Sequence, residues 1–409
     1  MILKDMNKIV FYKHPDYKAN FDLERILPKT DRIVFKEWNY DIGDPSCNNF
    51  LLMNVLDLEK VRSGEFWNIS DDLYNHCLKS NIKILLSTNR EFISSIDFGN
   101  KKVFPNCTFY ETVKRPNIYY LSNVLDYWCN EILPSNYLRM DNFAMQYRYA
   151  KDKQGFYKKE PLHDPRRFKM SVILGYPRPP RAALLYLLRH DCIANNPDVF
   201  YSNLPFEDDT ELHGDNHSVD MEVFDLIQKA FPGDDLINRF FYKKIEQTWK
   251  TPRIAEWEDD EIPENWRKKF YHKHDVSGAP TEWSVPEPMD NSYFTVFVET
   301  RPEVTSITEK FWKPIIAGIP AIWFAGPNMT QYLLDNGYKL FPRIDYSFDK
   351  ELNYHVRYKK FYRELQRLYN IHPNNWERYL EQHKDVLIHN QEHFYNQKEK
   401  DIERFCTAL

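Results

Sequence analysis

Residues 292–341 read SYFTVFVETRPEVTSITEKFWKPIIAGIPAIWFAGPNMTQYLLDNGYKLF. The stretch opens with an apolar strand that ends in the carboxylate of Glu299, and we expect a helix that starts at Ser306 and stops at Gly318. A second apolar strand follows at residues 321–324. Strand, helix and strand in this order predict one unit of a parallel α/β sheet.

The same alternation extends over most of the chain. We expect strands at residues 33–35, 50–55, 82–87 and 117–121, and then at 169–174, 197–202, 293–299 and 321–324. A helical, loop or inserted stretch separates each strand from the next, which is typical of parallel sheets. The sequence therefore predicts the α/β fold class, with two successive α/β units.

Shifts in composition give the expected domain boundaries. We expect an N-terminal domain at residues 1–150, a polar linker at 151–167, a C-terminal domain at 168–349 and closing helices at 350–409. In the last region apolar residues recur at three- and four-residue spacing, from which we expect two helices. Residues 249–288 are rich in tryptophan, proline and acidic residues, and we interpret them as a long excursion near a cleft.

The overall composition excludes several classes of protein. A chain of 409 residues that is 42% hydrophobic and 28% charged is typical of a globular protein that needs no disulfides. Its formal net charge of −5 provides no overall basic field for nucleic acid or membranes. The six cysteines form no C-x-x-C pair, so neither a zinc site nor a redox dithiol is expected. The charged N-terminus and the lack of any apolar run of about 18 residues predict a cytoplasmic protein with no membrane span.

A positively charged residue lies in the first turn of the helix expected between Ser306 and Gly318, where acidic residues are usual. Lys310 falls in its first turn, where a positive charge opposes the helix dipole by about 0.3–1 kcal/mol unless an anion binds there. Ser306 and Glu309 have the spacing of a capping box, which is a structural alternative for Glu309. Glu299 is well placed for a ribose or sugar hydroxyl, and its structural alternative is to cap a loop.

The start of a second expected helix also carries positively charged residues where acidic residues are usual. Arg178 and Arg181 lie three residues apart, after the strand at 169–174 and directly before the apolar run AALLYLL. Together with the N–H groups of that helix they are expected to form an anion site, whereas each alone is typical of a solvated arginine. Because two helices of one expected domain both begin with positively charged residues, we favour a diphosphate that binds to both helix starts.

These motifs resemble a known family. Phe297-Val-Glu299, followed by Ser306-Ile-Thr-Glu-Lys-Phe-Trp312 and Ala317-Gly-Ile-Pro320, resembles the donor-binding signature of the α-1,3-fucosyltransferases. The chain is also similar to glycosyltransferases of tailed bacteriophages and other large viruses. The motifs that recur there are Arg-Pro-x-x-Arg, Glu-Thr and Thr-Glu-Lys-x-x-Lys-Pro, which match Arg178 to Arg181, Glu299-Thr300 and Thr308 to Pro314. The resemblance covers residues 168–345.

The resemblance implies a GT-B glycosyltransferase, in which two Rossmann-like domains flank a cleft and C-terminal helices close the chain. The C-terminal domain would hold a nucleoside-diphosphate sugar, and no cofactor or metal would be needed. The implied donor-binding residues are Arg178, Arg181, Glu299, Thr300, Ser306, Thr308, Glu309 and Lys310. In this set the Arg and Lys side chains neutralise the diphosphate, and the two Glu side chains bind ribose or sugar hydroxyls. The sequence has no Asp-x-Asp after an apolar strand, and we interpret His272-Lys-His274-Asp275 as a solvated loop rather than a metal site.

Inverting transfer also needs a general base, which the related enzymes carry after a strand of the N-terminal domain. Glu91 follows the strand at 82–87 and is the candidate, and a solvated loop carboxylate is the competing interpretation. Glu37, Asp41 and Asp44 are the alternatives.

The acceptor is left open between a glycan and a hydroxymethylated pyrimidine in viral DNA, which would place the protein in the host cytoplasm. Residues 151–181 hold nine Lys or Arg against three Asp or Glu, which favours contacts to DNA phosphates, although such a linker is commonly just solvated. A non-catalytic sugar- or nucleotide-binding protein is the alternative function. A nicotinamide enzyme is disfavoured because no Gly-x-Gly-x-x-Gly occurs. The oligomeric state is also left open.

Overall fold

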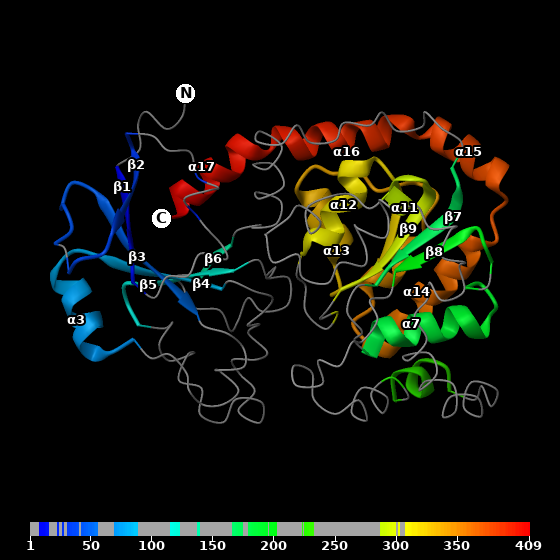
Figure 1. Ribbon diagram of the computed structural model, residues 1–409, viewed down its shortest axis with the longest axis horizontal. Coiled ribbons are helices and arrows are strands. Elements are labelled where there is room, and N and C mark those ends of the chain that lie inside the picture. The colour runs from blue at the N-terminus through cyan, green and yellow to red at the C-terminus, as the bar shows by residue number, and fades with distance from the viewer. Residues whose placement is uncertain are drawn as a thin grey trace, which may run out of the picture. The chain divides into compact units, whose positions relative to one another are not determined.

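The structure is a computed structural model that forms two compact units. The first unit comprises Met1–Phe156, Val304–Ile307 and Tyr395–Leu409, and the second comprises Tyr157–Glu303 and Thr308–Phe394 (Figure 1). The residues that the structure describes are 8–15, 23, 27, 31–40, 42–55, 69–88, 115–122, 137–139, 166–174, 179–194, 196–202, 223, 225–232, 287–299, 302 and 307–409.

The first unit contains a six-stranded parallel sheet with the strand order β2-β1-β3-β4-β5-β6. Its strands are β1 (Ile9–Lys13), β2 (Ile33–Glu37), β3 (Asn48–Val55), β4 (Lys83–Thr88), β5 (Ile118–Ser122) and β6 (Tyr137–Arg139). Every neighbouring pair is parallel. Helix α3 (Asp71–Lys79) precedes β4 and is capped by the hydroxyl of Ser70, which accepts from the backbone N–H of Leu73.

The four strands expected in this unit are confirmed as β2, β3, β4 and β5, and two further strands were missed. The more important of these is β1, which pairs with both β2 and β3 and whose residues Ile9 to Tyr12 are buried. Its apolar core is only four residues long and stands between Lys8 and Lys13, so the local pattern gave little sign of a central strand. Strand β6 is only three residues long.

The second unit contains a four-stranded parallel sheet with the order β10-β9-β7-β8. Its strands are β7 (Phe168–Ile173), β8 (Val199–Ser202), β9 (Ser292–Val298) and β10 (Ala321–Phe324), close to the four expected ranges. The helices described before the closing region include α7 (Pro179–His190), α11 (Glu287–Asp290), α12 (Glu309–Ala317), α13 (Met329–Asp335) and the short 3-10 helix η5 (Tyr346–Lys350). The α/β class with parallel sheets is therefore confirmed.

Helices cover both faces of this second sheet (Figure 1). Side chains alternate along β9, so that Val296 and Val298 join the core formed with α7, while Phe297 meets Phe311 of α12 with ring centroids 5.6 Å apart. All seven residues of β9 are buried, as expected for a strand of a parallel sheet that is covered on both faces.

The closing region contains four helices rather than the two expected. They are α14 (Tyr354–Tyr369), α15 (Pro373–Gln382), α16 (Lys384–Asn396) and α17 (Lys398–Ala408). The apolar residues keep a helical spacing across the breaks between these helices, so the pattern does not reveal the breaks. One break falls at His372, the N-cap of α15, whose ring accepts from the backbone N–H of Asn374.

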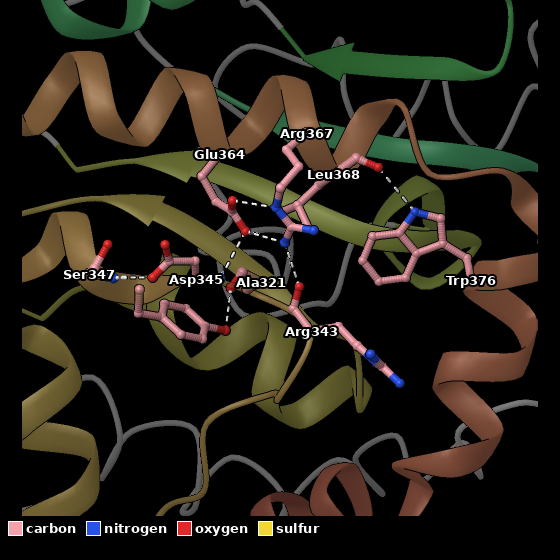
Figure 2. A network of polar contacts seen from close by, with 9 residues as sticks. Ala321, Arg343, Asp345, Ser347, Glu364, Arg367, Leu368 and Trp376 are labelled. Atoms are coloured by element: carbon pink, nitrogen blue, oxygen red, sulfur yellow. Dashed lines mark hydrogen bonds and ion pairs between the residues drawn. The ribbon is translucent and has the colours of Figure 1, made fainter.

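Helix α14 is fastened to the segment that follows α13 by a network of polar contacts (Figure 2). The carboxylate of Glu364 accepts from the backbone N–H of Asp345 at 2.8 Å and from the guanidinium of Arg367 at 2.6 and 2.7 Å. Arg367 also donates to the backbone oxygen of Arg343, and the hydroxyl of Tyr346 donates to the backbone oxygen of Ala321 in β10. These contacts fix α14 relative to the sheet.

The last helix, α17, belongs to the first unit. Its residues Ile402, Phe405 and Cys406 are buried in one cluster with Phe11 of β1 and Phe50 of β3. The ammonium group of Lys83 donates to the backbone oxygen of Leu409 at 3.1 Å. The expected boundary near residue 150 stays a prediction, because residues 140–165 lie outside the described part of the chain.

We expect Phe405→Ala to weaken the first unit specifically. Loss of a buried phenylalanine typically destabilises a core by about 3–5 kcal/mol. Hydrogen exchange measured by mass spectrometry should therefore show lost protection in peptides from β1 and β3 and unchanged protection in β9. The control is Arg404→Ala on the exposed side of the same helix, for which protection should not change. Full protection of β1 in Phe405→Ala would contradict the packing.

Candidate functional site

The candidate site lies at the carboxyl edge of the second sheet. Strand β9 ends at Val298, and the next residue, Glu299, still extends the ladder because its backbone N–H donates to the backbone oxygen of Phe324 at 2.9 Å. Phe324 is the last residue of β10, so two neighbouring parallel strands end together here. Ligands of open α/β sheets bind at this edge.

The hydroxyl of Thr308 holds the carboxylate of Glu299. The side-chain oxygen of Thr308 lies 2.8 Å from each carboxylate oxygen and donates its proton to them. The same oxygen accepts from the backbone N–H of Lys310 at 3.3 Å, which caps helix α12. Glu299 and Thr308 are both almost completely buried, with exposed fractions of 1% and 0%. One hydroxyl thus joins the end of β9 to the start of α12.

The start of α12 corrects the expected helix boundary. The N-cap is Thr308 and not Ser306, so Glu309 is the first residue of the helix and does not complete a capping box with Ser306. Both residues are good N-caps by type, so residue preference alone does not distinguish them. The expected end is confirmed, because Gly318 ends the helix in the left-handed region, at φ 65°.

The cation Arg181 reaches the same edge from α7. Arg181 is the third residue of that helix and is 3% exposed. Its guanidinium Nε donates to the backbone oxygen of Val298 at 2.9 Å, directly before Glu299. No acidic residue stands in the first turn of α7, so the positive end of the helix dipole and the guanidinium act together.

The second cation, Lys310, lies in the first turn of α12, as its position in the sequence predicts. It is 9% exposed, and its backbone N–H is the group that Thr308 caps. The structure therefore brings four of the expected donor-binding residues to one edge, from two helices and one strand: Arg181, Glu299, Thr308 and Lys310.

The other expected site residues are not placed. Arg178, Thr300, Ser306 and the candidate base Glu91 lie outside the described residues, as do Asp41 and the loop that contains His272 and His274. Glu309 opens α12, but its side chain is outside the described part. Their roles stay predictions.

Two alternative bases are described, and their surroundings do not favour proton abstraction. Glu37 is 79% exposed and lies 2.8 Å from the ammonium group of Lys13. The hydroxyl and the backbone N–H of Ser46 both donate to Asp44 and lower the pKa of this carboxyl. A carboxylate with a lowered pKa is a weaker base.

Sequence reasoning missed the contact that caps the start of helix α13. The carboxylate of Asp349, in η5, accepts from the backbone N–H and the hydroxyl of Thr330 at 2.8 and 2.6 Å and caps the start of α13. Burial raises the pKa of Asp349, although these hydrogen bonds and the charge of Arg357 act in the opposite direction. The start of α13 is thereby filled by the protein's own carboxylate. No local pattern links residues 19 positions apart.

Comparisons with known proteins include a distant structural likeness. No family model matches the chain, and no curated protein sequence matches it. The chain is similar to a crystal structure of an α1,3-fucosyltransferase, with 10% sequence identity and a TM-score of 0.37 over 93% of this chain and 91% of that one. A likeness this distant decides neither fold nor function.

The described residues contain no group of three or more His, Cys, Asp or Glu side chains arranged to hold a metal ion. No helix among them has the length and apolarity needed to cross a membrane.

We expect Asp349→Asn to flatten the pH dependence of stability. An acid whose pKa is raised by folding contributes stability that is fully present below its unfolded pKa, near 3.8, and is lost as the pH rises through its folded pKa. As the pH rises from about 3.8 through the folded pKa of Asp349, the free energy of unfolding should therefore fall more in the wild type than in Asp349→Asn. Urea unfolding at a series of pH values measures this difference. Asp335→Asn, on the exposed side of α13, is the control and should follow the wild type. Parallel curves for Asp349→Asn and the wild type would contradict a raised pKa.

Proposed function

We propose that the chain is a glycosyltransferase of the GT-B type, which moves a sugar from a nucleoside-diphosphate sugar to a hydroxyl group of an acceptor. The observation that carries the proposal is that two buried cationic residues stand in the first turns of helices at the edge where Glu299 lies: Arg181 donates to the backbone oxygen of Val298, and the backbone N–H of Lys310 is capped by the hydroxyl that holds Glu299. Glu299 and Lys310 lie in the motifs that resemble the donor-binding signature of the α-1,3-fucosyltransferases, and Arg181 lies in the Arg-Pro-x-x-Arg motif of the viral glycosyltransferases.

The two cations suit the leaving group of such a reaction. As the bond between the sugar and the diphosphate breaks, negative charge develops on the diphosphate oxygens. Arg181 and Lys310 each stand in the first turn of a helix, so a side-chain charge and the positive end of a helix dipole act in the same direction. Preorganised charges of this kind stabilise the developing anion without a metal ion.

Glu299 suits the sugar part of the donor. Thr308 donates to its carboxylate, which fixes the carboxylate at the end of β9, and carboxylate oxygens accept hydrogen bonds from sugar hydroxyls. A ribose or sugar hydroxyl donating to Glu299 would be fixed relative to the diphosphate, because Glu299 and Arg181 are joined through the backbone of Val298. In this proposal Glu91, on the first unit, takes the proton of the acceptor hydroxyl, and the transfer inverts the anomeric centre.

We expect Arg181→Ala and Lys310→Ala each to weaken binding of the nucleoside diphosphate. Loss of a hydrogen bond to a charged group costs about 1.5–3 kcal/mol, which corresponds to a roughly 10- to 150-fold higher Kd. Calorimetric titration of the wild type with UDP, GDP, CDP, ADP and dTDP identifies the base, and the variants are then measured with that nucleotide.

The matched control is Arg363→Ala, which removes an exposed arginine from α14. This variant should bind the nucleotide as the wild type does. Circular dichroism of all three variants checks that each is folded. Folded Arg181→Ala and Lys310→Ala proteins that bind the nucleotide normally would rule out the diphosphate assignment.

The acceptor is identified by transfer of labelled sugar from the donor found in this way. Hydroxymethylated duplex DNA and a panel of oligosaccharides are offered in parallel, and unmodified DNA of the same sequence is the control. Transfer to only one class names the acceptor. Binding of donor with neither transfer nor donor hydrolysis would instead favour a non-catalytic nucleotide-sugar-binding protein.

A further inference from the structure

We propose that Tyr358 and Arg357, neighbours in the first turns of α14, are positioning residues that fix the carboxyl edge of the second sheet for donor binding. The inference rests on the proposed function of this edge. It adds two residues that belong to neither the quoted signature nor the expected donor-binding set.

Tyr358 holds the start of α7. Its side chain is fully buried, and its hydroxyl donates to the backbone oxygen of Pro180 at 3.1 Å. Pro180 directly precedes Arg181 in the chain. Burial raises the pKa of Tyr358 well above its ordinary value, so the hydroxyl keeps its proton and stays a donor. The position of the Arg181 backbone therefore depends on this contact.

Arg357 holds the loop that follows β9. Its guanidinium is buried and donates to the backbone oxygen of Pro302 at 2.6 Å and to that of Glu351 at 2.8 Å. Pro302 lies three residues after Glu299. One planar guanidinium with donors at fixed angles thus sets where the chain leaves Glu299, which the more flexible ammonium group of lysine would not do.

The two residues share a third contact, the ring of Phe324 at the end of β10. The ring of Tyr358 meets it edge-on with centroids 4.8 Å apart, and the guanidinium of Arg357 lies 5.4 Å from its centroid. The backbone oxygen of Phe324 accepts from the N–H of Glu299. Two consecutive residues of one helix therefore contact Pro180, before Arg181, and Pro302, after Glu299.

The same helix provides a matched comparison. Tyr362 lies one turn after Tyr358 and is also buried, and its hydroxyl donates to the carboxylate of Asp191 at 2.6 Å. Asp191 directly follows the last residue of α7. Two tyrosine hydroxyls of α14 thus hold opposite ends of α7, and only Tyr358 holds the end that carries Arg181.

The experiment compares Tyr358→Phe with Tyr362→Phe. Each variant loses one buried hydroxyl and one contact with α7, so urea unfolding should show similar losses of stability. The Kd for the nucleoside diphosphate that the wild type binds best, from a panel of UDP, GDP, CDP, ADP and dTDP, should rise about tenfold in Tyr358→Phe and stay within about twofold in Tyr362→Phe. Arg357→Lys keeps the charge and loses the guanidinium geometry, and it should behave as Tyr358→Phe does.

Hydrogen exchange without nucleotide provides a second readout that does not depend on the proposed function. Exchange should increase at the start of α7 in Tyr358→Phe and at its end in Tyr362→Phe. The positioning inference is overturned if the two variants show the same nucleotide affinity and the same exchange at the start of α7. Arg181→Ala separates the two proposals. If Arg181→Ala loses nucleotide binding while Tyr358→Phe and Arg357→Lys bind normally, the proposed function stands and only the positioning role is removed. A wild type that binds none of the five nucleotides would overturn the proposed function and, with it, the donor-binding role of both residues.

Discussion

The hydroxyl of Thr308 is the contact on which the candidate site depends. It donates to the Glu299 carboxylate and accepts from the start of α12, so it fixes a buried negative charge and begins the helix that carries Lys310. A buried carboxylate without a donor would be costly, and a helix start without an acceptor would leave a backbone N–H unpaired. A single side chain meets both needs, which ties the end of β9 to the helix that follows it.

The three helix starts described at this edge differ in what they offer an anion. The carboxyl group of Asp349 occupies the start of α13 and accepts the hydrogen bonds of Thr330 there. The starts of α7 and α12 carry Arg181 and Lys310 instead. Under the proposed function, this difference favours an anionic ligand at the starts of α7 and α12 over the start of α13.

The sequence predicts those elements whose position is determined by the local pattern of apolar and turn residues. Apolar runs between turns located β3, β4 and the four strands of the second sheet, and the expected helix start near Ser306 placed Lys310 in a first turn. What it missed depends on contacts between distant residues. The N-cap Thr308 also holds the carboxylate of Glu299, nine positions earlier, and the cap of α13 comes from η5. Likewise, α17 is amphipathic like its neighbours, and only the core of the first unit shows where it packs.

Under the proposed function, the charges at this edge favour a reacting ligand over a merely bound one. Arg181, Lys310 and Glu299 are all at most 9% exposed. A diphosphate at this edge would gain negative charge as the sugar departs, and its attraction to the two cations would grow with that charge. The edge would then bind the departing group more strongly than the intact donor, and such a difference accelerates a reaction.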